Sequence, residues 1–384
     1  MMIKEISNFE SGTTFQKIEY KCFVPEKINY QWQINDNSLL VLLSEADREL
    51  GKLDAFSTLI PDIDFFIKMH ITKEATVSSK IEGTQTSFEE AFINESDIDP
   101  EKRDDWKEVH QYILAINEAI EEMKELPIST RLIKNTHRTL LSQARGKERL
   151  PGEFRSSQNW IGSSLKKAVF IPPSHEFIAE LMQDLENFCN SELLNSPIQV
   201  PHLIKIAIIH YQFETIHPFL DGNGRIGRLL ITLYLIDKQI LQKPTLYLSF
   251  FFEKNRREYY EKLTIVRTEN KLVSWITFFL IGIIETAKNS ITTFQNIIEL
   301  RERIEREILP TLGRKQKDCL KLINALYKQP VMDSNAIATI LDVHLSTANR
   351  MIKDLESKEI LTELTGYKRN RIFAFTPYID IFQD

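Results

Sequence analysis

The stretch HPFLDGNGRIGR, from His217 to Arg228, decides the fold, because one helix must end and another begin within it. It holds three of the 12 glycines of the 384-residue chain, together with a histidine, an aspartate and two arginines. Glycine backbone allows turns that a helix cannot contain, and successive N–H groups in such a turn can converge into a concave nest. We therefore predict a buried helix before His217, a loop, and a second helix that begins near Gly224.

The second helix gives this loop the character of an anion site. The N-terminus of a helix carries partial positive charge, and Arg225 and Arg228 lie three residues apart on one face of its first turn. Guanidinium groups form charge-assisted bonds with phosphate oxygens. Asp221 would repel a phosphate unless a divalent cation lies between them, which favours Mg²⁺.

His217 adds a candidate general base, because an imidazole at this place can take a proton from a hydroxyl group. Together with the anion site it predicts phosphoryl or nucleotidyl transfer, in which positioning and charge neutralisation dominate. Phosphate binding without catalysis, and a simple Gly-Asn-Gly turn, stay open as interpretations. The loop lacks the Gly-Lys-Ser/Thr of a Walker A motif, and it follows a helix, whereas a dinucleotide fingerprint follows a strand.

The composition, with 42% hydrophobic and 27% charged residues, is that of an ordinary globular protein of two or three domains. The longest apolar run, residues 275–284, has about half the length that spans a bilayer, and no apolar signal core opens the chain, so we expect no membrane partner. Three scattered cysteines give no disulfide framework or metal spacing, which favours the cytoplasm. The net charge of -6 gives no overall attraction to nucleic acid.

Helical periodicity covers most of the chain. We predict helices over residues 38–59, 65–81, 106–123, 128–141, 177–189, 201–214, 225–240, 254–266, 272–288 and 291–307. Residues 152–173 differ, because two short β-prone runs flank GSSLKK and predict a hairpin. Pro310 and Gly313 predict a linker after the last of these helices.

The twelve residues from His217 to Arg228 resemble, at every specified position, the Fic-family signature His-Pro-Phe-x-Asp/Glu-Gly-Asn-Gly-Arg-x-x-Arg. The resemblance extends over about residues 70–290. It implies a mainly α fold, a Fic-type helical bundle with a short β-hairpin flap. It also implies transfer of AMP from ATP to a Ser, Thr or Tyr hydroxyl of a protein.

The resemblance implies a role for each residue of the loop. His217 would deprotonate the target hydroxyl, Asp221 would hold Mg²⁺, and Phe219 would pack beneath the loop. The remaining residues would bind the phosphates of ATP: Gly222, Asn223 (also through its side-chain amide), Gly224, Arg225 and Arg228, the last on the γ-phosphate. Tyr259 and Tyr260 resemble aromatic residues that border the adenine, although one buried and one surface tyrosine is the alternative.

A second motif, TVSSKIEGTQ, precedes the loop by more than a hundred residues. It carries Ser78, Glu82 and Gly83, and it resembles the Fic-family inhibitory motif Ser/Thr-x-x-x-Glu-Gly/Asn. Ser78 and Glu82 share one face of a helix, and Gly83 stands where a helix would end. By the resemblance, Glu82 pairs with Arg228 within the chain and blocks the γ-phosphate pocket, so that ATP binds in a pose poorly aligned for attack.

The C-terminal residues 311–384 form a module of their own, with 11 Lys and Arg against 9 Asp and Glu. Three helical segments are followed by two alternating runs around a turn near residues 366–370, which predicts a winged helix-turn-helix. We expect Asp333 or Ser334 to cap the second helix and Ser346 to open the third. Polar and basic side chains along the third helix and the wing suit DNA, with protein docking as the alternative: Asn349, Arg350, Lys353, Lys368, Arg369 and Arg371.

We therefore expect an N-terminal helical segment with the inhibitory motif (residues 1–100), a Fic catalytic core (101–309) and a winged helix-turn-helix (310–384). The expected function is a cytoplasmic protein adenylyltransferase that uses ATP and Mg²⁺ and is self-inhibited by Glu82. Its target protein would dock at the flap, residues 152–173, and the chain could form a homodimer. The alternatives are a nucleotide-sensing DNA-binding regulator, and a Fic transferase of another phosphate-containing group such as UMP or phosphocholine.

Overall fold

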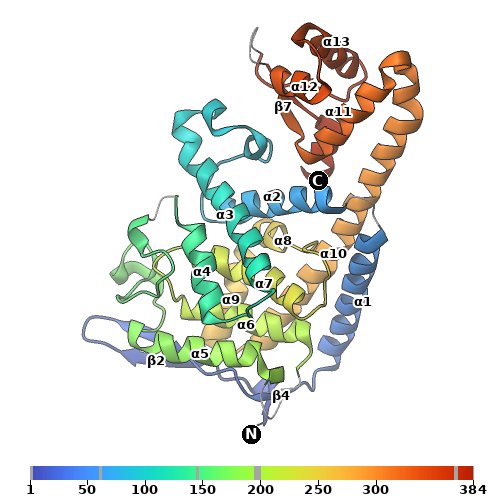
Figure 1. Ribbon diagram of the computed structural model, residues 1–384. Helices are drawn as coiled ribbons and strands as arrows, with labels where there is room; N and C mark the ends of the chain where they lie inside the picture. The colour runs from blue at the N-terminus through green and yellow to red at the C-terminus, as the bar shows by residue number, and fades with distance from the viewer. Residues whose placement is uncertain (1–2, 60–62, 144–146, 194–199, 367–370, 384) are drawn as a thin grey trace.

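The computed structural model describes residues 3–59, 63–143, 147–193, 200–366 and 371–383. The fold is mainly helical, as the sequence predicts, and its few strands form small sheets. Figure 1 shows a large helical lobe and a smaller C-terminal lobe, which the long helix α10 (Leu272–Arg303) joins.

Two consecutive helices, α6 (His202–Ile216) and α7 (Asn223–Asp237), form the centre of the large lobe. From Leu203 to Ile216 every residue of α6 is buried, as its all-round apolar sequence requires. Helices from both sides of the sequence surround this pair: α3 (Arg103–Glu122), α4 (Thr130–Leu140), α5 (Ile178–Cys189), α9 (Arg256–Glu269) and α10. The loop between α6 and α7 is therefore held on a rigid base.

The N-terminal helices complete this lobe. Helix α1 (Asn37–Leu59) packs along α10, and α2 (Ile63–Ile81) packs against α3 and the short α8 (Ser249–Lys254). The contacts of α2 with α3 cross residue 100, where the sequence predicts a domain boundary. Helix α2 is consequently part of the same packed core as α6 and α7.

Strands occupy part of the segment predicted as helical over residues 1–100, and that prediction is wrong for its first third. β1 (Ile3–Glu5) pairs in parallel with β4 (Gln31–Gln33), and β2 (Gly12–Gln16) pairs antiparallel with β3 (Lys21–Pro25). Strands of three to five residues are too short to give a clear alternating pattern. The predicted hairpin within 152–173 is present as β5 (Ile161–Gly162) and β6 (Ala168–Phe170).

Two predictions near the end of the large lobe are also wrong. The helices expected over 272–288 and 291–307 are the single helix α10, because Ser290 faces the interior and does not interrupt it. The linker expected at Pro310 and Gly313 is instead a run of helical turns, a π-helical one at Ile304–Ile308 and a 3-10 segment at Leu309–Lys315. Gly313 alone leaves the helical region, with φ of 54°, and kinks the segment.

The C-terminal lobe contains α11 (Gln316–Lys328), α12 (Ser334–Leu341) and α13 (Leu345–Glu356). Its three strands, β7 (Val331–Asp333), β8 (Thr362–Glu363) and β9 (Ile372–Ala374), form an antiparallel sheet in the order β7-β9-β8. Asp333 caps α12 as expected, whereas His344 rather than Ser346 caps α13, since its ring accepts the N–H of Ser346. Among the expected nucleic-acid contacts, Arg350 and Lys353 are exposed, and Lys368 and Arg369 lie outside the described residues. The winged-helix identity and its partner stay predictions.

A final helix, α14 (Thr376–Gln383), returns from the C-terminal lobe to the large lobe. It packs against α10 and α2, and Figure 1 shows the C-terminus beside α2. Its buried Phe382 contacts the ring of His70 with a centroid distance of 5.1 Å. The end of the chain thus contacts the helix that carries Ser78.

The segment Leu272–Lys328 contains a stretch that is long and apolar enough to cross a membrane by composition alone. Within the protein, 56% of its most apolar window is buried. Trp275 is fully buried there and donates its indole N–H to the carbonyl of Ala207 on α6, at 2.8 Å. The apolar face of α10 therefore forms part of the core.

Replacing Trp275 with alanine should lower the free energy of unfolding by about 3–5 kcal/mol, because it removes a buried indole at the contact of α10 with α6. Urea unfolding followed by circular dichroism measures this. Trp160→Ala is the matched control, since Trp160 is 42% exposed and its loss should change stability by less than about 0.5 kcal/mol. Equal effects of the two changes would contradict the central position of α10.

Candidate active site

Backbone geometry turns the chain sharply between α6 and α7. His217 ends α6 in the left-handed conformation (φ 50°, ψ 61°), and its N–H donates to the carbonyl of Phe213 at 2.9 Å. Gly222 precedes α7 with φ of 75°, a value that glycine adopts without strain. The loop predicted from the sequence is therefore present, with the imidazole at one end and a helix N-terminus at the other.

The loop is braced from within by Asn223. Its side-chain oxygen accepts the N–H of Phe219 at 2.8 Å, and its side-chain NH₂ donates to the carbonyl of the same residue at 2.9 Å. This differs from the role implied by the resemblance, in which the amide contacts phosphate. Because Asn223 is 2% exposed, backbone N–H groups are better placed than its side chain to meet an anion.

His137 of α4 supports the loop from below. Its Nε2–H donates to the carbonyl of Asp221 at 3.0 Å, and its Nδ1 accepts the N–H of Gly152 at 2.8 Å. The ring stacks on the buried ring of Phe219, as expected for a residue beneath the loop, with a centroid distance of 3.7 Å. Burial lowers the pKa of His137 to about 4, so the ring is neutral and keeps the tautomer that makes both bonds.

Arg155 ties the loop to the predicted flap. This buried guanidinium donates through Nε to the carbonyl of His217 at 2.9 Å, and through Nη2 to the carbonyl of Pro173 at 2.5 Å. Its backbone N–H also donates to the carbonyl of Pro218. Asn159 adds a bond from its amide to the carbonyl of Phe219 at 2.9 Å. The hairpin and the loop therefore keep a fixed relation.

His217 is neutral at physiological pH. Burial, and then the positive charge of Arg155, lower its pKa to about 4. Its Nδ1 lies 3.4 Å from the carbonyl of Glu214, one turn earlier on α6. A neutral imidazole is able to accept a proton, which is the state that a general base requires.

The first arginine of the loop, Arg225, is paired with carboxylates. It is 3% exposed, and its Nη1 donates to Glu108 of α3 at 3.1 Å. Its Nη2 lies 3.7 Å from Asp221, whose side chain is 46% exposed and also accepts the N–H of Gly222. The resemblance places Arg225 on phosphate, whereas here the buried Glu108 holds it and fixes its direction.

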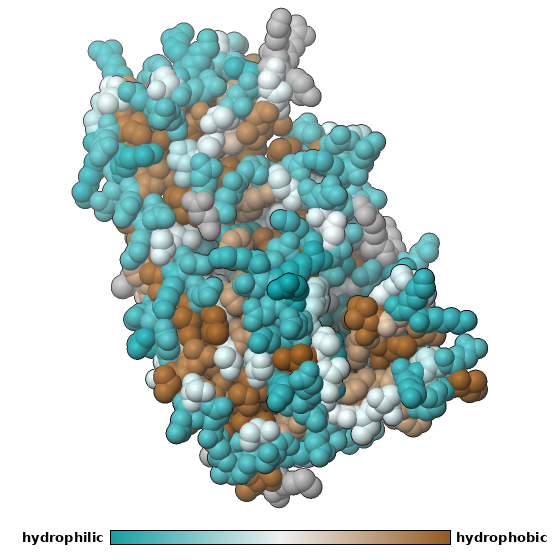
Figure 2. Space-filling model, turned by 180° about the vertical axis from the view of Figure 1, so that it is seen from behind, coloured by the Kyte–Doolittle hydropathy of each residue, from teal (hydrophilic) through white to brown (hydrophobic). Residues whose placement is uncertain are grey.

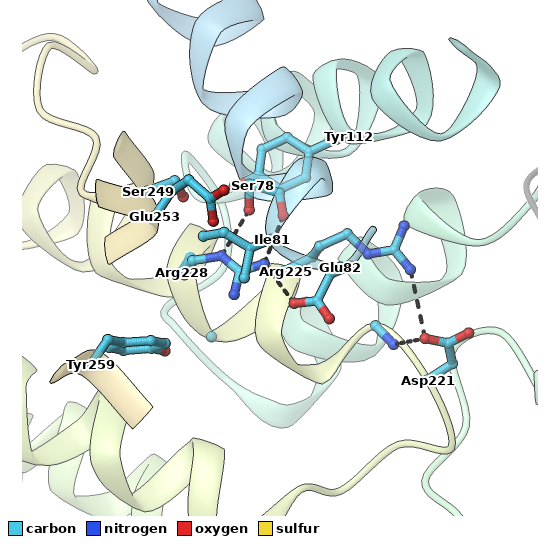
Figure 3. A network of polar contacts seen from close by, with 12 residues as sticks. Ser78, Ile81, Glu82, Tyr112, Asp221, Arg225, Arg228, Ser249, Glu253 and Tyr259 are labelled. Atoms are coloured by element: carbon cyan, nitrogen blue, oxygen red, sulfur yellow. Dashed lines mark hydrogen bonds and ion pairs between the residues drawn. The ribbon is translucent and has the colours of Figure 1, made fainter. Parts of the chain in front are cut away.

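The second arginine, Arg228, is buried against α2, as Figure 3 shows. Its Nε donates to the hydroxyl of Ser78 at 2.9 Å, and its Nη2 donates to the carbonyl of Ser78 at 2.9 Å. The same Nη2 donates to Glu82 Oε1 at 2.8 Å. The expected ion pair between Glu82 and Arg228 is therefore present, and Nε and Nη2 of this guanidinium bond to the end of α2 and the residue that follows it.

The carboxylate of Glu82 lies over the first turn of α7. A Cβ atom added to Gly224 would be 2.4 Å from Glu82 Oε1, so only glycine allows this approach. Burial raises the pKa of Glu82, but Arg228 outweighs it and holds the pKa below its usual range. An anion thus occupies the helix N-terminus that the sequence predicts as an anion site.

The segment that carries Ser78 and Glu82 is anchored on several sides. One turn before Ser78, the buried Glu74 accepts the hydroxyls of Tyr112 at 2.9 Å and Ser249 at 2.5 Å. At the end of α2, Arg256 donates to the carbonyl of Ile81 at 2.6 Å. Gly83 follows with φ of 110°, which ends the helix as predicted.

Comparison with known proteins identifies the architecture. Residues 40–121 match the sequence model described as Fic/DOC family N-terminal, and residues 127–235 match that of the Fic/DOC family. The chain belongs to the Fic/DOC family. The second match contains α6, α7 and the loop between them, and the first contains α2 with Ser78 and Glu82.

Relatives of known name are similar to part of this Fic chain. "Protein adenylyltransferase Fic" of Drosophila grimshawi is 37% identical over 114 residues, which are 30% of this chain and 21% of the relative. "Protein adenylyltransferase fic-1" of Caenorhabditis elegans is 32% identical over 133 residues, which are 35% of this chain and 23% of the relative. The chain thus spans less than a quarter of the length of these relatives.

Solved structures share the Fic fold. A Fic family protein from Desulfovibrio desulfuricans G20 aligns with a TM-score of 0.54 and 20% identity, over 88% of this chain and 96% of that one. Fic-1 from C. elegans aligns with a TM-score of 0.50 and 21% identity, over 69% of this chain and 75% of that one. At this identity the likeness concerns the fold.

The two predicted adenine-bordering tyrosines differ in position. Tyr259 is 1% exposed, stacks on Phe252 at 4.4 Å and donates its hydroxyl hydrogen to His210 Nε2 at 2.9 Å. Its ring belongs to an aromatic core, so the prediction that it borders a nucleotide is wrong for this state of the Fic core. Tyr260 is 43% exposed, and the alternative of one buried and one surface tyrosine holds.

The flap of this Fic core is supported from behind by the N-terminal hairpin. The N–H of Phe23 on β3 donates to the carbonyl of Ile171 at 2.9 Å, and Phe15 on β2 packs edge-on against Phe177. Exposed apolar side chains mark this corner: Ile18, Trp160, Ile161 and Val169. Figure 2 shows brown side chains among polar ones on the projection at its lower right, which is this corner of the molecule.

The loop of this Fic protein fits Mg²⁺ only as an ion that is held partly by the protein and partly by the phosphates of the substrate. Among the described residues no group of three or more His, Cys, Asp or Glu side chains forms a cage. Asp221 nevertheless presents a half-exposed carboxylate at the loop. Mg²⁺ usually binds through one or two carboxylates together with water and substrate phosphates, so this single side chain suffices for that mode.

Sequence reasoning missed the residues that hold the Fic loop in place, namely Glu108, His137, Arg155 and Asn159. Glu108 could have been found from the sequence, because it lies among apolar residues on the inward face of α3 and a buried carboxylate needs a partner. Arg155 gave no such signal, since its partners at Pro173 and in the loop lie 18 to 62 residues away in the sequence. Glu214 was missed as well: it is buried, Oε1 lacks a partner, and burial raises the carboxyl pKa to about 7.

The pH dependence of His217 tests the electrostatics of the Fic site. Because the folded-state pKa of about 4 lies below the ordinary value of about 6.5, the ring should stay neutral until the pH falls toward 4. Between pH 6.5 and 4 the ring is protonated in the unfolded chain but neutral in the folded chain. Protonation therefore favours unfolding, and the free energy of unfolding falls as the pH drops below about 6.5. NMR titration of the His217 ring, assigned by its loss in His217→Ala, measures this. A midpoint at or above 6.5 would contradict the burial argument.

Proposed function

We propose that this protein is a nucleotidyltransferase that moves AMP from ATP to a Ser, Thr or Tyr hydroxyl of a target protein. One observation carries the proposal: a neutral, half-buried imidazole lies at one end of the loop, and the helix N-terminus at its other end already holds an anion. The named function of the relatives, protein adenylyltransferase, supports the same chemistry.

In the proposed reaction the target hydroxyl oxygen attacks the α-phosphorus of ATP. A bond forms between that oxygen and the phosphorus, and the bond from the phosphorus to the bridging oxygen breaks, which releases pyrophosphate. His217 accepts the hydroxyl proton on a ring nitrogen, and its low pKa leaves it free to release this proton to water. Arg155 and Asn159 keep the loop carbonyls fixed while this occurs.

The backbone N–H groups at the start of α7 and the two arginines would neutralise the phosphates. Asp221 would hold Mg²⁺, which supplies charge neutralisation for the phosphates when it is bound. Glu108 keeps Arg225 pointing along the loop. Positioning, rather than covalent chemistry by the protein, would thus account for most of the rate.

Glu82 would inhibit this transfer within the same chain. Arg228 has one guanidinium, and its fork already serves Ser78 and Glu82. A γ-phosphate must therefore displace the carboxylate or bind elsewhere, and an ATP that binds elsewhere presents its α-phosphate poorly to His217. The ion pair has the advantage of high effective concentration, because both partners belong to one molecule.

The target segment would dock in extended form at the flap. The pairing of strand β6 with β5 involves only Ile161 and Gly162 of β5. Val169 within β6 is 81% exposed. Backbone pairing gives affinity without a fixed sequence, and apolar neighbours such as Trp160 and Ile161 add contact area. Transfer of the rival groups, UMP and phosphocholine, is distinguished from AMP transfer by labelling in parallel with a donor of each group.

His217→Ala should reduce AMP transfer by about 10²–10⁴-fold, because proton abstraction is lost. ATP binding should change little, since the anion site consists of backbone and arginine groups. The assay is labelling of target proteins with ATP and Mg²⁺, with ATP affinity measured by calorimetry. His175→Ala, an exposed histidine outside the loop, is the control and should label like the wild type. Transfer at the wild-type rate by His217→Ala would remove this residue from the mechanism.

Glu82→Gly should raise AMP transfer by about ten- to a hundredfold, because a charge-assisted pair of about 1.5–3 kcal/mol no longer competes with phosphate. Ser78→Ala should give a smaller gain, since Glu82 still reaches Arg228. Labelling of the protein itself and of lysate proteins measures both. Glu125→Gly, at an exposed position after α3, controls for the loss of a carboxylate.

The comparison requires that the variants melt at similar temperatures and bind ATP. Equal labelling by wild type and Glu82→Gly under those conditions would show that the Glu82–Arg228 pair does not limit transfer. The base and the inhibitory residue are thus tested independently.

A further inference from the structure

A cavity lies on the side of α2 that faces away from the loop between α6 and α7. It has a volume of about 460 Å³, within the range of small-molecule sites. Four elements form its walls: α2, the segment 84–88 that follows it, α8 through Phe250, and the end of α14. Helix α2 therefore separates this cavity from the ion pair of Glu82 with Arg228.

Buried polar atoms without partners line this cavity. The hydroxyls of Thr84 and Thr86 are buried, with exposures of 7% and 5%, and neither has a hydrogen-bond partner. A small adjoining cavity between α2 and α10 has two more, His70 Nε2 and the Tyr247 hydroxyl. Unpaired polar atoms at more than nine-tenths burial are costly, so two of them at each of these neighbouring cavities indicate a place for a polar ligand.

The lining also defines the charge and shape of that ligand. Lys73 and Lys80 contribute two cations, and among the described residues that line the 460 Å³ cavity none is acidic. Its apolar walls are aromatic: Phe88, Phe250 and Phe382. Lys73 already lies over the ring of Phe250, at 4.5 Å from its centroid.

We propose that this cavity binds a small organic anion with a flat aromatic body, and that the bound ligand holds α2 in its inhibitory position. The anionic group meets Lys73 and Lys80, the ring packs among the phenylalanines, and the threonine hydroxyls bond its polar substituents. The regulatory half of this inference rests on the proposed function, whereas the binding half does not.

The direction of the effect follows from linkage. The cavity has its shape while Ser78 and Glu82 of the α2 segment contact Arg228. A ligand that fits this shape binds this conformation better than one in which α2 has moved, so binding favours the inhibited state. The buried Glu74 strengthens the coupling, because it borders the adjoining cavity and also anchors α2 to Tyr112 and Ser249.

The binding half is tested on the full chain with 1-anilinonaphthalene-8-sulfonate, an aromatic anion whose fluorescence rises on binding. We expect one saturable site. Lys80→Gln and Thr86→Val should each weaken it about three- to tenfold, the effect of one lost polar contact. Val77→Trp, which fills the cavity, should abolish binding of the probe.

The control variants are Lys358→Gln and Thr339→Val, at exposed positions in the C-terminal lobe, and they should bind the probe like the wild type. Melting temperatures show that each variant is folded.

Absence of saturable binding, or equal binding by all five variants, would overturn the site. The coupling is read by hydrogen exchange, which the same probe should slow in the amides of α2. Unchanged or faster exchange there would overturn the regulatory half. The probe should also lower AMP labelling by wild type at least about threefold and leave Glu82→Gly unaffected. If no variant transfers AMP, the proposed function fails, while fluorescence and exchange still decide the cavity and its coupling.

Discussion

The buried guanidinium of Arg228 is the constraint on which the rest of this site depends. A buried cation must be paired and hydrogen-bonded, and here Ser78 and Glu82 supply partners to Nε and Nη2. The ion pair joins residues that are 146 positions apart in the sequence. It holds α2 against α7, and it also places a carboxylate where a phosphate would bind. One interaction thus serves both the packing of the core and the inhibition that we propose.

The loop itself does not rely on that interaction. Asn223 and Phe219 close it from within, and His137 and Arg155 hold its carbonyls from α4 and the flap. None of these bonds includes Glu82 or Ser78. Displacement of the carboxylate from Arg228 therefore leaves the loop in shape, which is the property that a reversible inhibitor segment requires. The cavity behind α2 gives a small ligand a means to act on that segment without entering the active site.

Sequence reasoning succeeded where the signal is local. The loop, the C-terminal end of α2 and the capping of α12 by Asp333 follow from glycine positions and capping residues within a few positions of each other. It failed where long-range packing overrides local pattern. The sequence predicts separate helices over 272–288 and 291–307, yet α10 continues between them because Ser290 faces the core. Tyr259 was assigned to the nucleotide, but its hydroxyl pairs with His210 inside an aromatic cluster.

The sequence by itself determined the chemistry: a histidine, a helix N-terminus and two arginines in twelve residues, and a glutamate spaced to meet one of them. Those elements are contiguous in the chain, so their spacing is enough to fix them. Only the tertiary structure decided which groups are free to act. It pairs Arg225 with Glu108, and it bonds the side-chain amide of Asn223 to the backbone of Phe219. It also makes His217 a neutral base, through burial and the nearby charge of Arg155. Burial and the charge of neighbours depend on residues brought together by folding, and the order of residues along the chain does not specify them.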